Sequence, residues 1–313
     1  MKFLTNPCTD PHWNMAHDEF LLEGLREKVF CLWQNRPSVI IGLNQSAPAE
    51  VNLKYLETHD ITLARRVTGG GAVYHDLGNL NYSIAGPARE MENAYGLMAE
   101  TLQSLGVPAV RSGRNDILVE GRKCSGYAKR LSKDRMLIHG TLLWDANLEQ
   151  LTNALAVPGS KLQAAGIASV RSRVANLKAY LPQFQDIGAF REALQTILAQ
   201  GDAEIFPTPE QLRSIGKMAS GKFRSWEWIM GHSPAAIFEK TQKFACGTIQ
   251  VRYTLKHGVF EQVIFGGDFL GDRPAEELAE QMRGKRPDEV QSFPVHAYFD
   301  GVDGAALSAL FEG

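Results

Sequence analysis

The sequence predicts an α+β protein in which mixed or antiparallel sheets are flanked by helices, with a small α+β domain at the C-terminal end. Two observations predict this fold class. Segments with helical apolar spacing and short β-rich runs follow one another along the chain, and the composition changes near Ala245. Because 313 residues suffice for one large and one small domain, we expect a large domain at 1–244 and a small accessory domain at 245–313.

Helices are expected where apolar residues recur at helical spacing. Asp10 and Pro11 form a typical helix start, and Phe20, Leu21 and Leu25 then share one face of the segment that follows. The expected helices span residues 13–28, 48–59, 90–105, 148–155, 186–199, 209–218, 274–283 and 304–311.

Strands are expected at β-rich runs bounded by turn residues. They span residues 29–34, 38–43, 61–67, 79–85, 107–111, 116–120, 136–144, 248–255 and 259–265. Arg36 and Pro37 separate the first two, which form a hairpin or two separate sheet strands, whereas residues 121–135 are polar and basic. From Phe260 onward the chain carries eleven acidic residues against four basic ones, which sets the small domain apart.

Composition excludes several classes of protein. Hydrophobic residues make up 44% and charged residues 22%, and the net charge of -2 gives no global attraction for polyanions. No apolar stretch approaches the length of a membrane span, and the N-terminus is unlike a signal peptide. The four cysteines are far apart, with no CxxC pair. We therefore expect a cytoplasmic protein that has no structural zinc, membrane or nucleic-acid partner.

The stretch from Arg65 to Leu80 is the strongest local signal. An apolar run delivers Arg65 and Arg66 to three consecutive glycines, 69–71. Glycine runs are costly to order, and they occur where backbone amides must approach a ligand or adopt positive φ. Such amides can form an anion-binding nest, and a neighbouring arginine can grip phosphate. The spacing matches neither a P-loop nor a Rossmann turn, so a different anion-handling loop is expected.

Two further segments are cationic. Residues 111–135 hold eight basic residues against three acidic ones, and residues 161–178 hold four basic residues and no acid. A basic segment alone is typical of a solvated surface. Together with the glycine loop, in a protein of nearly neutral charge, these segments indicate an anionic ligand or partner.

These motifs, taken in order, resemble the lipoate–protein ligase A family in its two-domain bacterial form. The resemblance rests on Arg-Arg-Val-Thr-Gly-Gly-Gly-Ala-Val-Tyr-His-Asp at 65–76, Gly-Arg-Asn-Asp at 113–116, Gly-Arg-Lys-Cys-Ser-Gly at 121–126, His-Gly-Thr-Leu-Leu at 139–143 and Ser-Val-Arg-Ser-Arg-Val at 169–174. It implies a catalytic fold related to biotin ligases and class II synthetases. It also implies activation of lipoate by ATP to lipoyl-AMP, followed by transfer to a lysine of an acceptor domain.

The resemblance assigns roles to individual residues. Lys123 is implied as the catalytic cation that contacts both the acyl oxygen and the α-phosphate, which suits a compact charge placed between two anions. Asp116 is the best carboxylate for Mg²⁺. The nucleotide site is implied to include Arg66, Gly71, Ala72, Val73, Tyr74, Asn115, Asp116, Lys123, Arg171 and Arg173. The substrate pocket is implied to include Gly69, Gly70, His75, Ser125, Gly126 and His139.

The family further implies a lid and specific partners. Residues 159–178 lack a clear period and would close the site against water, since an acyl adenylate hydrolyses readily. The implied acceptors are lipoyl domains of 2-oxo acid dehydrogenase E2 subunits and the glycine cleavage H protein. Octanoate has the same carbon chain as lipoate, so preference between them stays open.

Several alternatives remain at this point. His75 and His139 have a suitable ordinary pKa for a base, but each is more often a structural residue. Cys124, beside Lys123, raises the alternative of an ATP-independent octanoyl or lipoyl acyltransferase, although related transferases carry their cysteine upstream of the lysine. A polyanion-binding module and a biotin ligase are the remaining hypotheses.

Overall fold

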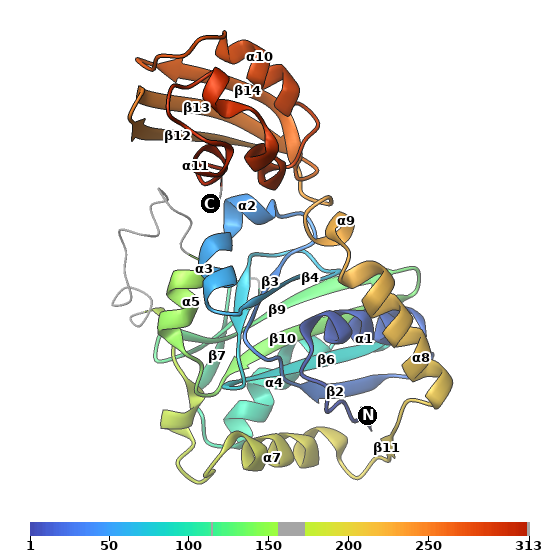
Figure 1. The fold of residues 1–313 in the computed structure, drawn as a ribbon. Helices are drawn as coiled ribbons and strands as arrows, with labels where there is room; N and C mark the ends of the chain where they lie inside the picture. Colours follow the sequence, from blue (N-terminus) through green and yellow to red (C-terminus); the bar gives the residue numbers. More distant parts are fainter. Residues whose placement is uncertain (114, 156–172, 312–313) are drawn as a thin grey trace.

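In a computed structural model, residues 1–113, 115–155 and 173–311 are described. Within them the strands form three sheets (Figure 1). The largest has eight strands in the order β11-β1-β2-β6-β10-β9-β8-β7. Its strands are β1 (Lys2–Leu4), β2 (Val29–Trp33), β6 (Asn79–Pro87), β7 (Ala109–Ser112), β8 (Asp116–Val119), β9 (Arg122–Ser132), β10 (Arg135–Leu143) and β11 (Glu204–Ile205).

Both faces of the large sheet are covered by helices. Strand β2 shows why, since Phe30 and Leu32 join one apolar core while Cys31 and Trp33 join the other. This alternation follows from the two-residue period of a strand. The first core includes α4 (Ala94–Ser104) and α7 (Ile187–Ala199), and the second includes α1 (Pro11–Glu23) and α8 (Pro209–Met218). Helix α1 starts at the expected place, where the Asp10 side chain accepts backbone N–H groups.

A second sheet carries the glycine loop. Its order is β4-β3-β5, with β3 (Ser38–Ile41) parallel to β4 (Thr62–Arg65) and antiparallel to β5 (Val73–His75). Helices α2 (Ala47–Glu50), α3 (Leu53–Thr58) and α5 (Leu148–Leu155) pack against it in one core. The loop between β4 and β5 thereby faces the large sheet.

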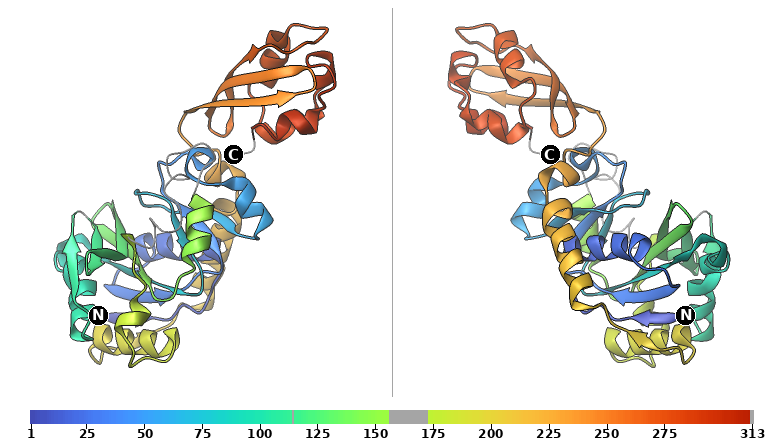
Figure 2. Two further views of the ribbon diagram at one scale, coloured as in Figure 1. Left: turned by 90° about the vertical axis from the view of Figure 1, so that its left-hand side faces the viewer. Right: turned by 90° about the vertical axis from the view of Figure 1, so that its right-hand side faces the viewer.

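The C-terminal unit has its own sheet and core. Strands β12 (Ala236–Phe244), β13 (Gly247–Lys256) and β14 (Val259–Gly267) form an antiparallel sheet covered by α10 (Ala275–Met282) and α11 (Gly304–Ser308). The unit stands at one end of the molecule and follows α8 and α9 (Trp226–Ile229), as Figures 1 and 2 show. The sheet begins with β12, upstream of the expected boundary at residue 245. The sequence pattern did not mark this start, because β12 is largely polar and exposed.

The predicted α+β class, with mixed and antiparallel sheets and a small C-terminal domain, is confirmed. Strands β1, β5, β11 and β12 were not predicted, and two further segments differ from expectation. Residues 121–135 are mostly strand, because β9 pairs with β8 and β10 even though many of its side chains are polar and partly exposed. The helix expected at 48–59 is two short helices, interrupted at Val51. Of the two arrangements left open for β2 and β3, the structure has two separate sheet strands, because they belong to different sheets. Among the described residues, no helix is both long and apolar enough to cross a bilayer.

Candidate active site

The glycine loop meets different demands at its three glycines. Gly70 has φ of 95°, and a Cβ built there would lie 2.9 Å from Arg66 Nη2, so the fold itself requires glycine at this position. A Cβ on Gly69 or Gly71 would meet nothing within 4 Å. The fold does not require glycine at those two positions, and their lack of a side chain leaves space beside the loop.

Arg66 holds the backbone of the glycine loop through hydrogen bonds. Its guanidinium is buried and donates to the Thr68 hydroxyl at 3.1 Å and to the carbonyls of Ile40, Gly69 and Gly71 at 2.7–3.2 Å. Burial lowers the pKa of Arg66 to about 10, so the charge persists at neutral pH. These bonds give Arg66 a clamping role toward the loop backbone, next to the space where a phosphate was expected.

Arg65 has a different set of partners. Its side chain is fully buried and donates to the carbonyls of Gly42, Leu43 and Gln45 on one side. On the other side it donates to the carbonyls of Trp228 and Ile229 and to the Ser233 hydroxyl. Arg65 therefore ties the linker before β12 to the glycine-loop sheet and takes no part in the pocket.

Lys123 extends from β9 on the opposite side of the pocket. The register pairs Asp116 on β8 with Gly126 on β9, and the Lys123 ammonium lies 2.7 Å from Asp116 Oδ1. A Cβ on Gly126 would fall 2.8 Å from Lys123 Cε, so this glycine makes room for the lysine. The Lys123 side chain is 41% exposed, and its carbonyl accepts the Ala175 N–H at 2.9 Å. The ammonium is thus held by one half-exposed carboxylate.

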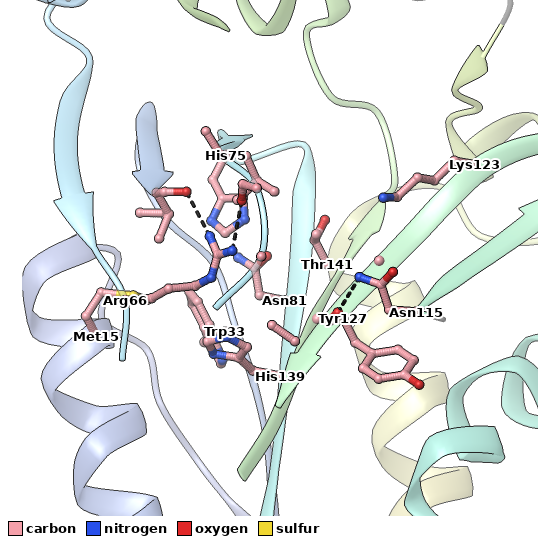
Figure 3. A pocket seen from close by; sticks show the side chains of 18 residues that line it. Met15, Trp33, Arg66, His75, Asn81, Asn115, Lys123, Tyr127, His139 and Thr141 are labelled. Atoms are coloured by element: carbon pink, nitrogen blue, oxygen red, sulfur yellow. Dashed lines mark hydrogen bonds between the residues drawn. The ribbon is translucent and has the colours of Figure 1, made fainter. Parts of the chain in front are cut away.

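A pocket of about 170 Å³ lies between these two walls. Figure 3 shows Lys123 and Asn115 on one side and Arg66 and His75 on the other. Much of the lining is apolar, from Met15, Trp33, Ile40, Val73 and Ala128. A second hollow of about 190 Å³ shares Ala72, Val73, Lys123, Gly126 and Thr141 with the first, and reaches Leu151 and Leu155 of α5. Lys123 therefore stands where an apolar pocket meets a second binding space.

Most residues singled out from the sequence meet at this place. The first pocket is lined by Arg66, Gly70, Gly71, Ala72, Val73, His75, Asn115, Lys123, Gly126 and His139. Tyr74 and Ser125 line the second hollow only, while Asp116 reaches the site through its ion pair with Lys123. Gly69 lies on the loop but lines neither space, and Arg173 is exposed and lines neither. Arg171 and most of the expected lid lie outside the described residues.

Some pocket residues were not identified from the sequence. Trp33, Asn81 and Thr141 lie side by side on neighbouring strands, because the register pairs Trp33 with Asn81 and Asn81 with Thr141. The same row continues to Gly126. Alternation along each strand identifies which face a residue occupies, but only the pairing register brings the row together.

Comparison with known proteins decides the family. The sequence model of the lipoyl protein ligase A/B catalytic domain matches residues 10–199, and that of the bacterial lipoate protein ligase C-terminus matches residues 233–303. The chain belongs to the lipoate–protein ligase family. Lipoate–protein ligase 1 of Staphylococcus aureus is 37% identical over 97% of this chain and 97% of its own length.

Solved structures agree with this family. One describes a bipartite lipoate protein ligase of Thermoplasma acidophilum and its E2 lipoyl domain, with a TM-score of 0.67 and 28% identity over 74% of this chain and 96% of that one. A lipoate–protein ligase A bound with ATP has a TM-score of 0.64 and 27% identity over 74% and 98%. P. falciparum LipL1 in complex with lipoate has a TM-score of 0.62 and 25% identity over 90% and 88%.

Neither histidine of this ligase is well placed as a general base. Burial, together with the charges of Arg66 and His139, lowers the pKa of His75 to about 3, which makes it a poor base at neutral pH. His139 has both ring nitrogens engaged, with Nδ1 2.6 Å from Asp18 Oδ2 and Nε2 2.7 Å from the Thr68 hydroxyl. Both are better explained as walls of the pocket.

Cys124 lies in the core and not in the pocket. It is fully buried, its thiol lies 3.4 Å from the Ile117 carbonyl, and burial raises its pKa to about 12. A thiol with that pKa is not a nucleophile at neutral pH. Cys124 packs in the apolar core whereas Lys123 lines the pocket, so the two side chains lie on opposite sides of β9. The acyltransferase alternative is therefore not favoured.

Proposed function

We propose that this ligase uses ATP to convert lipoate to lipoyl-AMP and transfers the lipoyl group to a lysine of an acceptor domain. The observation that carries the proposal is the shared pocket, in which Lys123 faces the glycine loop across an apolar space. Further support comes from similar ligases whose solved structures have ATP bound in one case and lipoate in another.

The chemistry explains why a lysine belongs at that junction. A carboxylate acylates an amine only after activation, and attack on the α-phosphorus of ATP brings two anions together. Lys123 supplies a positive charge that contacts both and stabilises the charge that develops between them. The apolar pocket holds the acyl chain, whose four or so methylenes contribute roughly 3 kcal/mol of binding at about 0.8 kcal/mol each. Octanoate gains the same amount, so its preference relative to lipoate is set elsewhere.

The second hollow and the loop amides suit the nucleotide. Ala72 and Val73 line both spaces and Gly71 lines the first, and the missing side chains at Gly69 and Gly71 leave room for phosphates. We assign the nucleotide contacts of this loop to its backbone, with Arg66 fixing the loop's shape. Arg171 and Arg173 remain proposed phosphate ligands.

Asp116 fits a Mg²⁺ site. Magnesium is usually held by one or two protein carboxylates together with substrate phosphates, and Asp116 is half-exposed beside Lys123. When bound, the ion would neutralise phosphate charge. The carboxylate that holds the Lys123 ammonium at 2.7 Å would then exchange partners, leaving the ammonium available to the acyl and phosphate oxygens.

The proposed acceptors are lipoyl domains of E2 subunits and the glycine cleavage H protein. The similar ligase of Thermoplasma acidophilum was studied together with its E2 lipoyl domain, which supports the first. The H protein and a cytoplasmic location stay predictions; the latter agrees with four free cysteines.

The test is direct. Incubation with ATP, Mg²⁺, lipoate and an apo lipoyl domain is expected to add one lipoyl mass to the acceptor and to release AMP. Absence of both acylation and lipoate-dependent pyrophosphate exchange would overturn the proposal. Transfer from octanoyl-acyl carrier protein without ATP would instead support the acyltransferase.

A further inference from the structure

A buried chain of hydrogen bonds joins the glycine loop to helix α1. It starts at Arg66 Nε, which donates to the Thr68 hydroxyl at 3.1 Å. The Thr68 hydroxyl lies 2.7 Å from His139 Nε2, and His139 Nδ1 lies 2.6 Å from Asp18 Oδ2. All of these side chains are buried, and Asp18 is only 1% exposed.

The donors and acceptors of this chain agree in one direction only. Arg66 can only donate, so the Thr68 hydroxyl accepts from it; with His139 neutral and its proton on Nδ1, the Thr68 proton goes to His139 Nε2. His139 then donates from Nδ1 to Asp18, which as a carboxylate only accepts. The second Asp18 oxygen accepts from the Ser83 hydroxyl at 2.5 Å, and Ser83 accepts from Trp33 Nε1 at 2.8 Å.

The two ends of the chain are opposite charges. Among the described residues, no carboxylate forms an ion pair with Arg66, and Asp18 pairs with no lysine or arginine, only with the ring of His139. A buried charge is costly unless it is paired and hydrogen-bonded. The relay of hydrogen bonds through Thr68 and His139 therefore connects the two buried charges, and it fixes the orientation of the Arg66 guanidinium.

We infer that Asp18 is a positioning residue for the glycine loop, acting through His139 and Thr68 on Arg66. It touches neither pocket, but it determines which His139 nitrogen accepts from Thr68. Thr68 in turn orients the guanidinium that grips the carbonyls of Gly69 and Gly71. Loss of the charge at Asp18 loosens the loop without removing any group that contacts substrate.

The experiment compares Asp18→Asn, Thr68→Val and the double variant. Asparagine keeps an acceptor but no charge, and valine keeps the shape of threonine without its hydroxyl. Amide hydrogen exchange of a peptide covering residues 67–73 is measured in the substrate-free protein. Each single variant is expected to raise exchange there about tenfold, the size expected for a lost hydrogen bond to a charged group. The double variant should match the singles, because the relay acts as one unit.

A matched control separates the relay from general destabilisation. Thr101→Val removes a buried threonine hydroxyl on α4, which bonds the Leu97 carbonyl, far from the loop in sequence. It should leave exchange at 67–73 unchanged, and Thr68→Ser should restore it. Unchanged loop exchange in both single variants, or effects that add fully in the double variant, would overturn the inference.

A kinetic readout rests on the proposed function, whereas the exchange readout does not. In the ligase assay, both variants should raise the KM for ATP about tenfold while changing kcat less, since the loop binds rather than reacts. If the wild-type protein showed no ligase activity, the proposed function would fail, and the exchange measurement would still decide the role of Asp18.

Discussion

The two walls of the pocket are built in opposite ways. The glycine-loop wall is held by a buried arginine, whose bonds reach several carbonyls and a relay to Asp18. The Lys123 wall presents a half-exposed ammonium held by one half-exposed carboxylate. Preorganised backbone suits a ligand that must be bound in one geometry. A cation that can exchange partners suits the two proposed steps, because Lys123 would contact a carboxylate and a phosphate in the first step and the acyl phosphate attacked by an amine in the second.

Replacing Lys123 should give the largest effect on activity. Lys123→Ala is expected to lower the rate of lipoyl-AMP formation and of transfer about 10²–10³-fold, because the charge between the two anions is lost. Stability should stay within about 0.5 kcal/mol, since an exposed lysine contributes little packing. Pyrophosphate exchange and thermal unfolding measure the two quantities. Lys129→Ala, on the same strand but over Tyr95, is the control and should retain activity.

Replacing Arg65 should show the reverse pattern. Arg65→Ala is expected to lower the free energy of unfolding by roughly 3 kcal/mol, because it leaves buried carbonyls without donors and opens a cavity. Urea denaturation measures the loss. A change within 0.5 kcal/mol would show that the linker and the loop sheet are not held together by this side chain.

Acid should weaken the fold through one buried histidine. His17 on α1 is fully buried, neither of its ring nitrogens has a partner in the described chain, and burial lowers its pKa to about 4. Because this is below the ordinary value near 6.5, the unfolded chain takes up a proton first as pH falls. Its contribution to stability is complete above pH 6.5 and is lost progressively toward pH 4.

His17→Phe isolates that contribution. Phenylalanine keeps the stacking with Trp13, whose ring centroid lies 5.2 Å away, and removes the titration. Urea denaturation at pH 7 and pH 4.5 should show a smaller loss of stability in the variant than in the wild type, by up to about 3 kcal/mol. Equal losses in both proteins would place the acid sensitivity elsewhere.

Two alanine substitutions within the glycine loop should give the smallest effects, and they separate the demands of the fold from those of ligand binding. Gly70→Ala should cost about 1–2 kcal/mol of stability, because alanine is strained at φ of 95° and approaches Arg66. Gly71→Ala should leave stability nearly unchanged while raising the KM for ATP, since its Cβ enters the open space beside the loop. Thermal unfolding and ATP titration separate the two, and equal behaviour would contradict the distinction.

The sequence was most informative where chemistry requires a rare residue pattern. The glycine run, Lys123 and Asp116 were all placed at the site from their motifs, and the strands that carry them mostly follow from β-rich runs. Strand β9 was not predicted, because it is rich in polar and basic residues that hide the usual apolar alternation. Asp18 had no motif of its own, and only the packing of α1 on β10 brings it to His139.

Roles were harder to predict than positions. Arg65 and Arg66 are neighbours with the same chemistry, and the sequence motif assigned Arg66 to the nucleotide and gave Arg65 no separate role. The structure turns both guanidinium groups toward backbone carbonyls, one set in the linker and one in the loop. Which acceptors a buried arginine finds depends on long-range contacts that local patterns do not encode.

The partners of Arg65 also determine where this ligase can be divided. Half of its acceptors belong to residues 228–233, which lie before the small sheet. These residues are therefore needed to satisfy a buried side chain of the larger unit. A shortened protein that ends after Ser233 keeps all the hydrogen-bond acceptors of the Arg65 guanidinium. One that ends before Trp226 loses half of these acceptors and leaves the cation without them. Attempts to produce the catalytic half alone, or to pair it with a foreign C-terminal unit, should therefore join the pieces between Ser233 and Ala236.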